Sequence, residues 1–287
     1  MAFSNSSILA VVELICYAVL IPFSLYVGFR HGKKAILGYL YLNILCTLRV
    51  VADIIQLASG TNPNAKPSLA ATIVSSVGLS PLLLGLAGFL HEIHIYVVMA
   101  TASSRTSFKK ANRWMWFAQF QIHGTCVVGV ILVIIGTVEL YSASSTSQLH
   151  TDDSLRSAGA VILVVLWGLL LNYAIYLLRR CRQLEGQLVR GLSDYIYWTQ
   201  IAAVFIGVKM VYVVVYTFDH NDASLSPVTG SFAIKVIFTF LTSFLAALSF
   251  TIGGWRSLHI AVAAPKFAVV DRYDAPHEVR TVQMNRK

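Results

Sequence analysis

Seven long apolar stretches, separated by short polar segments, follow one another along almost the whole chain. A helix needs roughly 20 mostly apolar residues to cross a bilayer, and each stretch reaches that length. None of them alternates apolar and polar positions as a strand of a membrane barrel would, so the pattern predicts helices. The expected spans cover residues 8–29, 35–58, 69–90 with an extension towards 102, 114–141, 158–178, 195–218 and 230–253.

The composition supports the same fold class. Hydrophobic residues make up 56% of the 287 residues and charged residues 12%, whereas soluble domains carry about 25% charged residues. The sequence therefore predicts an all-α, polytopic membrane protein. One seven-helix transmembrane domain is expected over residues 1–255, with the Gly253-Gly254-Trp255 run ending the last span. A polar tail over residues 256–287 is expected to be disordered.

Loop charges predict the orientation of the helices. Basic residues gather after the first, third, fifth and seventh spans, and the opposite loops carry few. Because Lys and Arg near span ends stay cytoplasmic, we predict an outer N-terminus and a cytosolic C-terminus, in the endoplasmic reticulum or the plasma membrane. The net charge of +9 then reflects contact with lipid headgroups, and no nucleic-acid partner is expected. Asn5-Ser6-Ser7 is a glycosylation sequon on the predicted outer side.

Five ionisable residues lie at membrane depth, where charges are costly and usually mark a function or a structural pair. Counting about 1.5 Å per residue along each predicted helix places all of them in the outer half of the membrane. We therefore expect a polar chamber there, open to the lumen or the exterior. The residues are Glu13, Arg49, Asp53, Lys209 and Lys235.

A purely structural role is one interpretation of these charges. Arg49 and Asp53 are four residues apart and could pair along one helix face. Lys235 is shallow enough to reach the headgroups. Glu13 has no opposite charge within a turn of its own helix, so it would need Arg49 or Lys209 on another helix as a bridge partner.

A ligand site is the other interpretation. In it the cations Arg49, Lys209 and Lys235, together with Tyr212, hold an anionic or carbonyl group of an apolar or amphipathic small molecule. Glu13 or Asp53, if protonated, could then donate a proton as a catalytic acid.

Other polar features carry weaker signals. His91-Glu92-Ile93-His94, expected at the cytosolic end of the third span, differs from the zinc motif H-E-x-x-H because its histidines are three residues apart. We expect no metal site there and no cofactor. His123 is expected to be a packed, hydrogen-bonded histidine. Pro81 should kink the third span.

Four segments together resemble a known family of ascomycete seven-span integral membrane proteins, described only as a domain of unknown function. By this resemblance Glu13, Arg49 and Lys209 belong to a shared pattern, while Asp53 replaces a small residue. The family's last span often carries an acid, which residues 229–253 lack. The resemblance implies a filamentous fungal source and no particular activity. The segments are Arg30-His31-Gly32, Arg49 with Gln56-Leu57-Ala58, Gly78-Leu79-Ser80-Pro81-Leu82-Leu83-Leu84 and Lys209-Met210-Val211-Tyr212.

Several functions are compatible with these observations. An enzyme of fungal specialised metabolism, such as a membrane-bound terpene cyclase, would use Glu13 or Asp53 as the acid and tyrosine faces to stabilise a cation. A seven-helix receptor or sensor, or a small-molecule transporter, would bind without catalysis. No cysteine lies in the predicted outer loops to form a receptor-type disulfide, and no repeat typical of transporters is evident. The sequence leaves the choice and the oligomeric state open.

Overall fold

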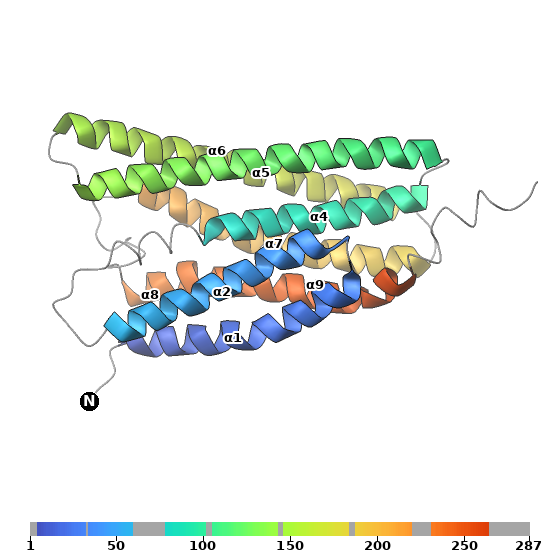
Figure 1. Cartoon of the computed structure of the whole chain (residues 1–287), viewed down its shortest axis with the longest axis horizontal. Helices are drawn as coiled ribbons and strands as arrows, with labels where there is room; N and C mark the ends of the chain where they lie inside the picture. The colour runs from blue at the N-terminus through green and yellow to red at the C-terminus, as the bar shows by residue number, and fades with distance from the viewer. Residues whose placement is uncertain are drawn as a thin grey trace, which may run out of the picture.

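The computed structural model describes residues 5–32, 34–59, 78–101, 105–142, 146–183, 187–219 and 231–263, nearly all of them helical. The elements form one elongated bundle (Figure 1). Within the described ranges, seven helical segments are long and apolar enough to cross a membrane, with α8, η2 and α9 forming the last one. The prediction of an all-α, multi-pass membrane protein is confirmed. The elements are α1 (Asn5–His31), α2 (Ile36–Ser59), α4 (Leu79–Thr101), α5 (Arg105–Ser142), α6 (Thr146–Arg182), α7 (Gln187–Phe218), α8 (Phe232–Ile234), the π-helix η2 (Lys235–Leu241) and α9 (Thr242–Ala263).

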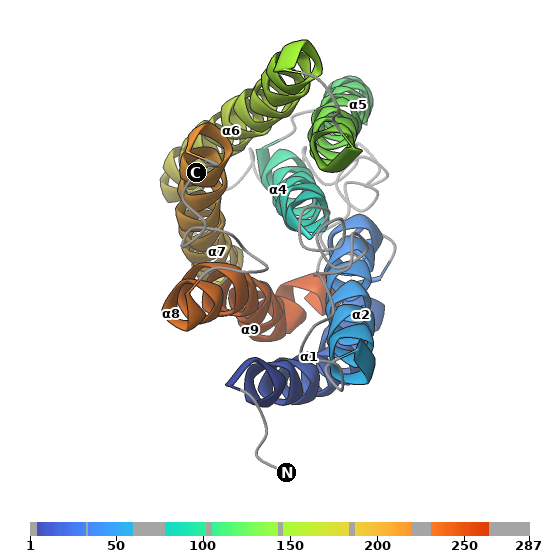
Figure 2. The ribbon, with the colours of Figure 1, turned by 90° about the vertical axis from the view of Figure 1, so that its left-hand side faces the viewer.

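Helix α4 lies inside a ring formed by the other spans (Figure 2). Its span is 83% buried, against 22% for the span in α5. Helix α4 is buried because it carries apolar side chains on every face. Its residues Leu83, Leu86 and Phe89 are completely buried. A helix that is apolar all round is stable only where other helices enclose it.

Small residues allow the helices around α4 to approach closely. A Cβ atom on Gly88 would lie 2.5 Å from the backbone nitrogen of Gly38 in α2, closer than real contacts allow. Glycine at these positions brings the two backbones together, as is common between membrane helices.

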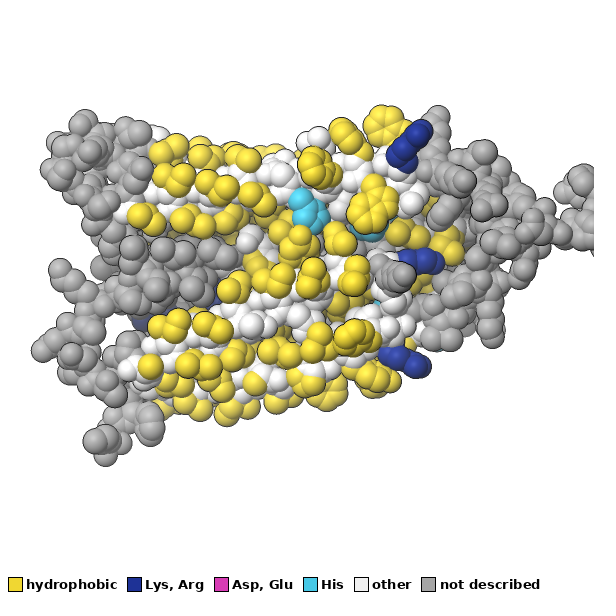
Figure 3. All heavy atoms as spheres, in the orientation of Figure 1, with side chains coloured by type: hydrophobic (Ala, Val, Ile, Leu, Met, Phe, Trp, Pro, Cys, Tyr) yellow, Lys and Arg dark blue, Asp and Glu magenta, His cyan; other side chains and the backbone are white. Residues whose placement is uncertain are grey.

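The face of the bundle seen in Figure 3 is apolar along its length, as contact with lipid requires. Large side chains such as Phe29, Phe120 and Leu169 are more than half exposed. Lys and Arg side chains gather at the end of this face where α1 ends (Figures 1 and 3). That end is the one predicted to face the cytosol.

The third span begins later than the sequence pattern indicates. Helix α4 runs from Leu79 to Thr101, and residues 69–77 of the predicted span lie outside the described residues. Pro81 is therefore in the first turn, where backbone N–H groups have no intrahelical partner. The expected kink within the span is wrong for this reason. The same shift moves Glu92 from the end of the span to its middle.

The last span also continues further than expected. Gly253-Gly254-Trp255 lies within α9, which extends to Ala263, so the prediction that this run ends the helix is wrong. A Cβ atom on Gly253 would lie 2.7 Å from the Cβ of Trp198 in α7. The glycines thus serve close packing between helices. Residues 264–287 of the predicted tail lie outside the described part of the chain.

Candidate functional sites in the bundle core

Four of the five predicted membrane-depth residues come together near the end of the bundle where α1 begins. Glu13 lies on α1, Arg49 and Asp53 on α2, and Lys209 on α7, and all four side chains are buried. The four groups lie close enough to interact electrostatically. Glu13 interacts with Arg49, Asp53 and Lys209, and Arg49 also interacts with Asp53 and Lys209. We call these residues, with Tyr17 and Ser243, the Arg49 cluster.

The contacts in the Arg49 cluster differ from the pairing expected within α2. Arg49 Nη1 lies 4.0 Å from Glu13 Oε2, so the ion pair joins two helices. Among the described residues Asp53 Oδ2 has no hydrogen-bond partner, and the expected Arg49–Asp53 pair is not formed. Lys209 Nζ donates to Ser243 Oγ at 2.6 Å, and no described acid bridges it.

Several buried polar atoms of this cluster have no partner in the described structure. They are Nε and Nη2 of Arg49, Oδ2 of Asp53 and the hydroxyl of Tyr17. Buried polar groups are nearly always hydrogen-bonded, because leaving them unpaired is costly. The cluster therefore has the chemistry of an incomplete site that a polar group of another molecule would complete.

A second buried arginine shows what a completed contact looks like in this bundle. Arg156 on α6 donates from Nη2 to the backbone oxygen of Tyr216 at 2.8 Å. Its guanidinium also lies 4.8 Å from the centre of the Tyr216 ring. Arg156 is 5% exposed and Arg49 is 7% exposed. The two arginines are therefore equally buried and differ in the hydrogen bonds that their guanidinium groups make.

A π-helical segment, which the sequence pattern did not predict, adjoins the Arg49 cluster. The segment η2 ends at Leu241, just before Ser243, and Ser243 Oγ donates back to the backbone oxygen of Thr239 at 2.8 Å. Short π segments inside α-helices are frequent at functional sites. In this span the change of pitch accompanies the placement of Ser243 against Lys209.

The remaining predicted ligand-binding residues lie at or beside this segment. Tyr212 is buried and stacks on Phe238 of η2 with ring centroids 5.3 Å apart. Lys235, the first residue of η2, is half-buried, and no described contact joins its ammonium group to the Arg49 cluster. The structure thus brings Tyr212 near the cluster and leaves Lys235 outside it. Asn5, the predicted glycosylation site, is exposed as the first residue of α1.

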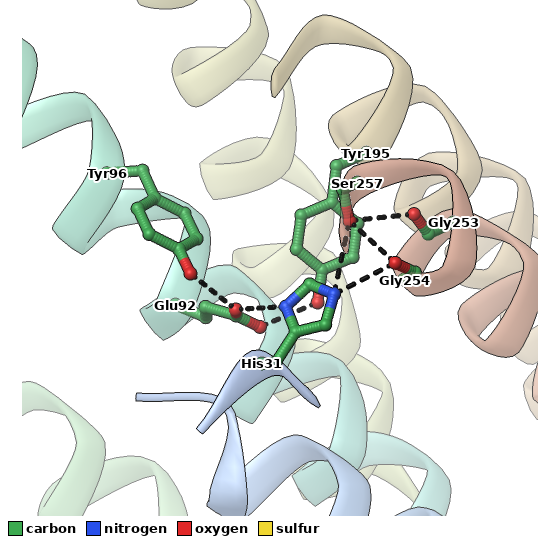
Figure 4. A network of polar contacts seen from close by, with 7 residues as sticks. All are labelled: His31, Glu92, Tyr96, Tyr195, Gly253, Gly254 and Ser257. Atoms are coloured by element: carbon green, nitrogen blue, oxygen red, sulfur yellow. Dashed lines mark hydrogen bonds and ion pairs between the residues drawn. The ribbon is translucent and has the colours of Figure 1, made fainter. Parts of the chain in front are cut away.

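A second polar group, which we call the Glu92 network (Figure 4), lies towards the other end of the bundle, where α1 ends at His31. Glu92 of α4 is completely buried. Its Oε1 atom lies 2.7 Å from His31 Nδ1 of α1 and accepts from the Tyr96 hydroxyl at 3.1 Å. Its Oε2 atom accepts from the Tyr195 hydroxyl of α7 at 2.7 Å.

The far side of the His31 ring is bonded as well. His31 Nε2 lies 2.8 Å from the backbone oxygen of Gly254 in α9. Because a carbonyl oxygen only accepts, Nε2 must carry a proton. Ser257 Oγ donates to the same oxygen at 3.1 Å. Both ring nitrogens and both carboxyl oxygens therefore have partners, and the Glu92 network ties α1, α4, α7 and α9 together.

Lys34 lies next to the Glu92 network, in the turn between α1 and α2. Its Nζ donates to Met99 Sδ at 3.4 Å and lies 5.5 Å from the centre of the Tyr96 ring. Burial lowers the pKa of the Lys34 ammonium, and the charge of Glu92 opposes this effect. The lysine therefore adds a basic group at this end of the bundle.

The Glu92 network was not predicted because the third span was expected to cover residues 69–90 with an extension towards 102, which placed Glu92 at its cytosolic end. With the observed bounds, Glu92 is an acid in the middle of a span and would have stood out together with Glu13. The sequence pointed to His31 only as part of the Arg30-His31-Gly32 segment, and to Gly254 only as part of the Gly253-Gly254 pair. Among the described residues, no group of three or more His, Cys, Asp or Glu side chains could hold a metal ion.

Comparison with known proteins identifies a family and no activity. Residues 3–259 match the model of the family described as Domain of unknown function (DUF7702). None of the curated proteins compared with the chain matches it. Because the family model covers nearly the whole chain, the protein belongs to this family.

Proposed function

We propose that this member of the DUF7702 family binds an amphipathic small molecule in the core of its bundle, with Arg49 and Lys209 holding an anionic or carbonyl group of the ligand. The observation that carries the proposal is the buried guanidinium of Arg49. Two of its three nitrogens have no partner among the described residues. The nearby Lys209 supplies a second buried basic group.

The unpaired atoms of Arg49 form one edge of the guanidinium. The N–H groups of Nε and Nη2 point in parallel, which is the geometry that binds a carboxylate or a similar acceptor with two hydrogen bonds. The other edge, through Nη1, faces Glu13. Glu13 therefore orients the arginine, and the free edge is available to a ligand.

Other groups at the site suit the rest of such a molecule. Oδ2 of Asp53 can accept from a ligand hydroxyl, and the Tyr17 hydroxyl can donate or accept. The aromatic rings nearby would contact an apolar body. Tyr17 meets Phe240 and Phe244 edge-on with centroids 6.3 and 5.8 Å away.

A more specific form of this proposal is that the protein also catalyses a reaction of the bound molecule. A membrane enzyme of fungal specialised metabolism, such as a terpene cyclase, would need an acid beside aromatic faces. The geometry favours Asp53 over Glu13 as that acid, because Glu13 already faces a guanidinium and Asp53 Oδ2 has no described partner. A receptor or transporter would use the same binding step without turnover, in the endoplasmic reticulum or the plasma membrane.

The test compares molecules that co-purify with matched variants. The wild type, Arg49→Gln and Arg156→Gln are expressed in a filamentous fungus and purified in mild detergent, and their extracts are compared by mass spectrometry. Compounds with a carboxyl or carbonyl group should be retained by the wild type and by Arg156→Gln. Their yield should fall at least about tenfold in Arg49→Gln, since losing charge-assisted hydrogen bonds costs about 1.5–3 kcal/mol each. Identical extracts from all three proteins would contradict the proposal.

A further inference from the structure

A third group of buried polar side chains lies between α4 and α5, apart from the two already described. His91 of α4 is 3% exposed and Gln119 of α5 is 2% exposed. Among the described residues, Nδ1 of His91, both amide atoms of Gln119 and Nε2 of His123 have no hydrogen-bond partner. No residue of the Arg49 cluster takes part, so a site at this interface is independent of the proposed function.

His91 faces α5, where Gln119 and His123 lie one turn apart. The His91 ring lies edge-on to Trp116 of α5, with centroids 5.3 Å apart, and it interacts electrostatically with His123. Gln119 lies between these two positions on the same face of α5, one turn from each. Buried donors and acceptors are thus gathered in one place without partners.

The tautomer of His123 is set by its backbone contact. His123 Nδ1 lies 2.7 Å from the carbonyl oxygen of Gln119, one turn earlier. Since that oxygen only accepts, Nδ1 carries the proton, and Nε2 of the neutral ring presents a lone pair. Nε2 therefore needs a donor from outside the described residues, whereas the Gln119 amide offers both a donor and an acceptor.

The site lies at mid-length of the bundle and next to its lipid-facing surface. His91 and His123 are each near the middle of their spans, Leu79–Ala100 and Asn112–Val138. His123 is half-buried, and its ring lies 5.3 Å from that of Tyr41 in α2. Figure 3 shows a histidine side chain at the surface midway along the bundle, among hydrophobic side chains. An occupant would therefore come from the hydrocarbon phase.

From this arrangement we propose that the α4–α5 interface binds the hydroxyl group of a neutral, lipid-soluble alcohol. The hydroxyl donates to Nε2 of His123 and accepts from the Gln119 amide. A carbonyl group would leave Nε2 unpaired, because it cannot donate. An ionic head group would find no described contact with a counter-charge here, since the acid next to His91 in sequence, Glu92, points into its own network.

The experiment uses the full-length protein in phosphatidylcholine nanodiscs and two photoreactive probes, diazirine derivatives of farnesol and of its methyl ether. Farnesol should label peptides of α4 and α5 around this interface, and the ether, which lacks the donor, should label them at least about fivefold less. Gln119→Met and His123→Phe should each lower farnesol labelling by about tenfold, the usual effect of losing one buried hydrogen bond. His94→Phe is the matched control, because His94 already pairs with Tyr173 of α6, and it should label like the wild type.

Stability and metal content complete the test. Gln119→Met replaces a buried, unpaired amide by an apolar side chain of similar shape, which should leave the melting temperature unchanged or raise it. Equal labelling by the two probes, or normal farnesol labelling of Gln119→Met, would show that water alone satisfies these atoms and would overturn the proposal. Zinc or copper retained by the wild type and lost from His123→Phe would overturn it in favour of a metal.

Discussion

Replacing Glu92 by glutamine tests whether the Glu92 network contains a buried ion pair. The carboxyl oxygens meet three groups, His31 Nδ1 at 2.7 Å, the Tyr96 hydroxyl at 3.1 Å and the Tyr195 hydroxyl at 2.7 Å. An amide keeps the shape of the side chain but turns one of the two oxygens into a donor. At least one of the three neighbours then faces the wrong group or must rotate.

The size of the loss can be worked out from these contacts. Leaving one buried hydrogen-bonding group unpaired costs about 1–3 kcal/mol. Removing one partner of a buried ion pair costs about 3–5 kcal/mol, because the other charge stays buried without a counter-ion. The two effects overlap, so Glu92→Gln should lower the free energy of unfolding by about 3–5 kcal/mol. If His31 and Glu92 were both neutral, the amide would imitate the protonated acid and the loss would be much smaller.

The assay is unfolding by dodecyl sulfate in mixed micelles, followed by tryptophan fluorescence. Asp194→Asn is the matched control, since Arg256 Nη2 lies 3.1 Å from Asp194 Oδ2 and joins α7 to α9 with side chains that are 55% and 51% exposed. Exposed pairs contribute about 0–1 kcal/mol. If Glu92→Gln costs no more than Asp194→Asn, the interpretation as a buried ion pair is refuted.

Three further predictions concern topology, a buried acid and helix packing. A reporter fused after Lys287 should stay protected from external protease in intact cells while Asn5 is outside; digestion of the reporter would reverse the orientation. Because Glu13 faces Arg49, Glu13→Gln should lower protein abundance by leaving the guanidinium without its counter-charge; normal abundance with metabolite output lowered by a factor of about 10² or more would instead make Glu13 a proton donor, and normal values of both would remove it from either role. Gly88→Ala should lower the unfolding free energy by about 1–3 kcal/mol through overpacking, whereas Gly168→Ala, with nothing within 4 Å of the added Cβ, should be neutral or stabilising; equal effects in chemical unfolding would contradict the packing argument.

The helices were predictable because the bilayer sets their length and polarity. Six predicted spans fall almost entirely within observed helices, several of which extend further, and the third was displaced because residues 69–77 are as apolar as a span. Hydrophobicity alone does not show where within a long apolar run a helix begins. The signals for a start at Leu79 were local, a glycine before it and Pro81 in its first turn.

The members of the Arg49 cluster were visible in the sequence because charges stand out in apolar runs. Their pairing was not, since it depends on how each helix is rotated about its axis. Arg49 faces Glu13 on α1 and not Asp53 on its own helix. The π segment η2 changes that rotation within one span, and its sequence, Lys235–Leu241, carries no signal that separates it from an α-helix.

The enclosed position of α4 explains why its polar side chains dominate the core. Successive residues of a helix point about 100° apart, so the side chains of His91-Glu92-Ile93-His94 point towards several neighbouring helices. Glu92 contacts α1 and α7, and His94 contacts Tyr173 of α6. His91 turns towards α5, where its Nδ1 finds no partner among the described residues. Because the other spans enclose α4, a molecule that enters the α4–α5 interface can supply hydrogen bonds that the described part of the chain does not.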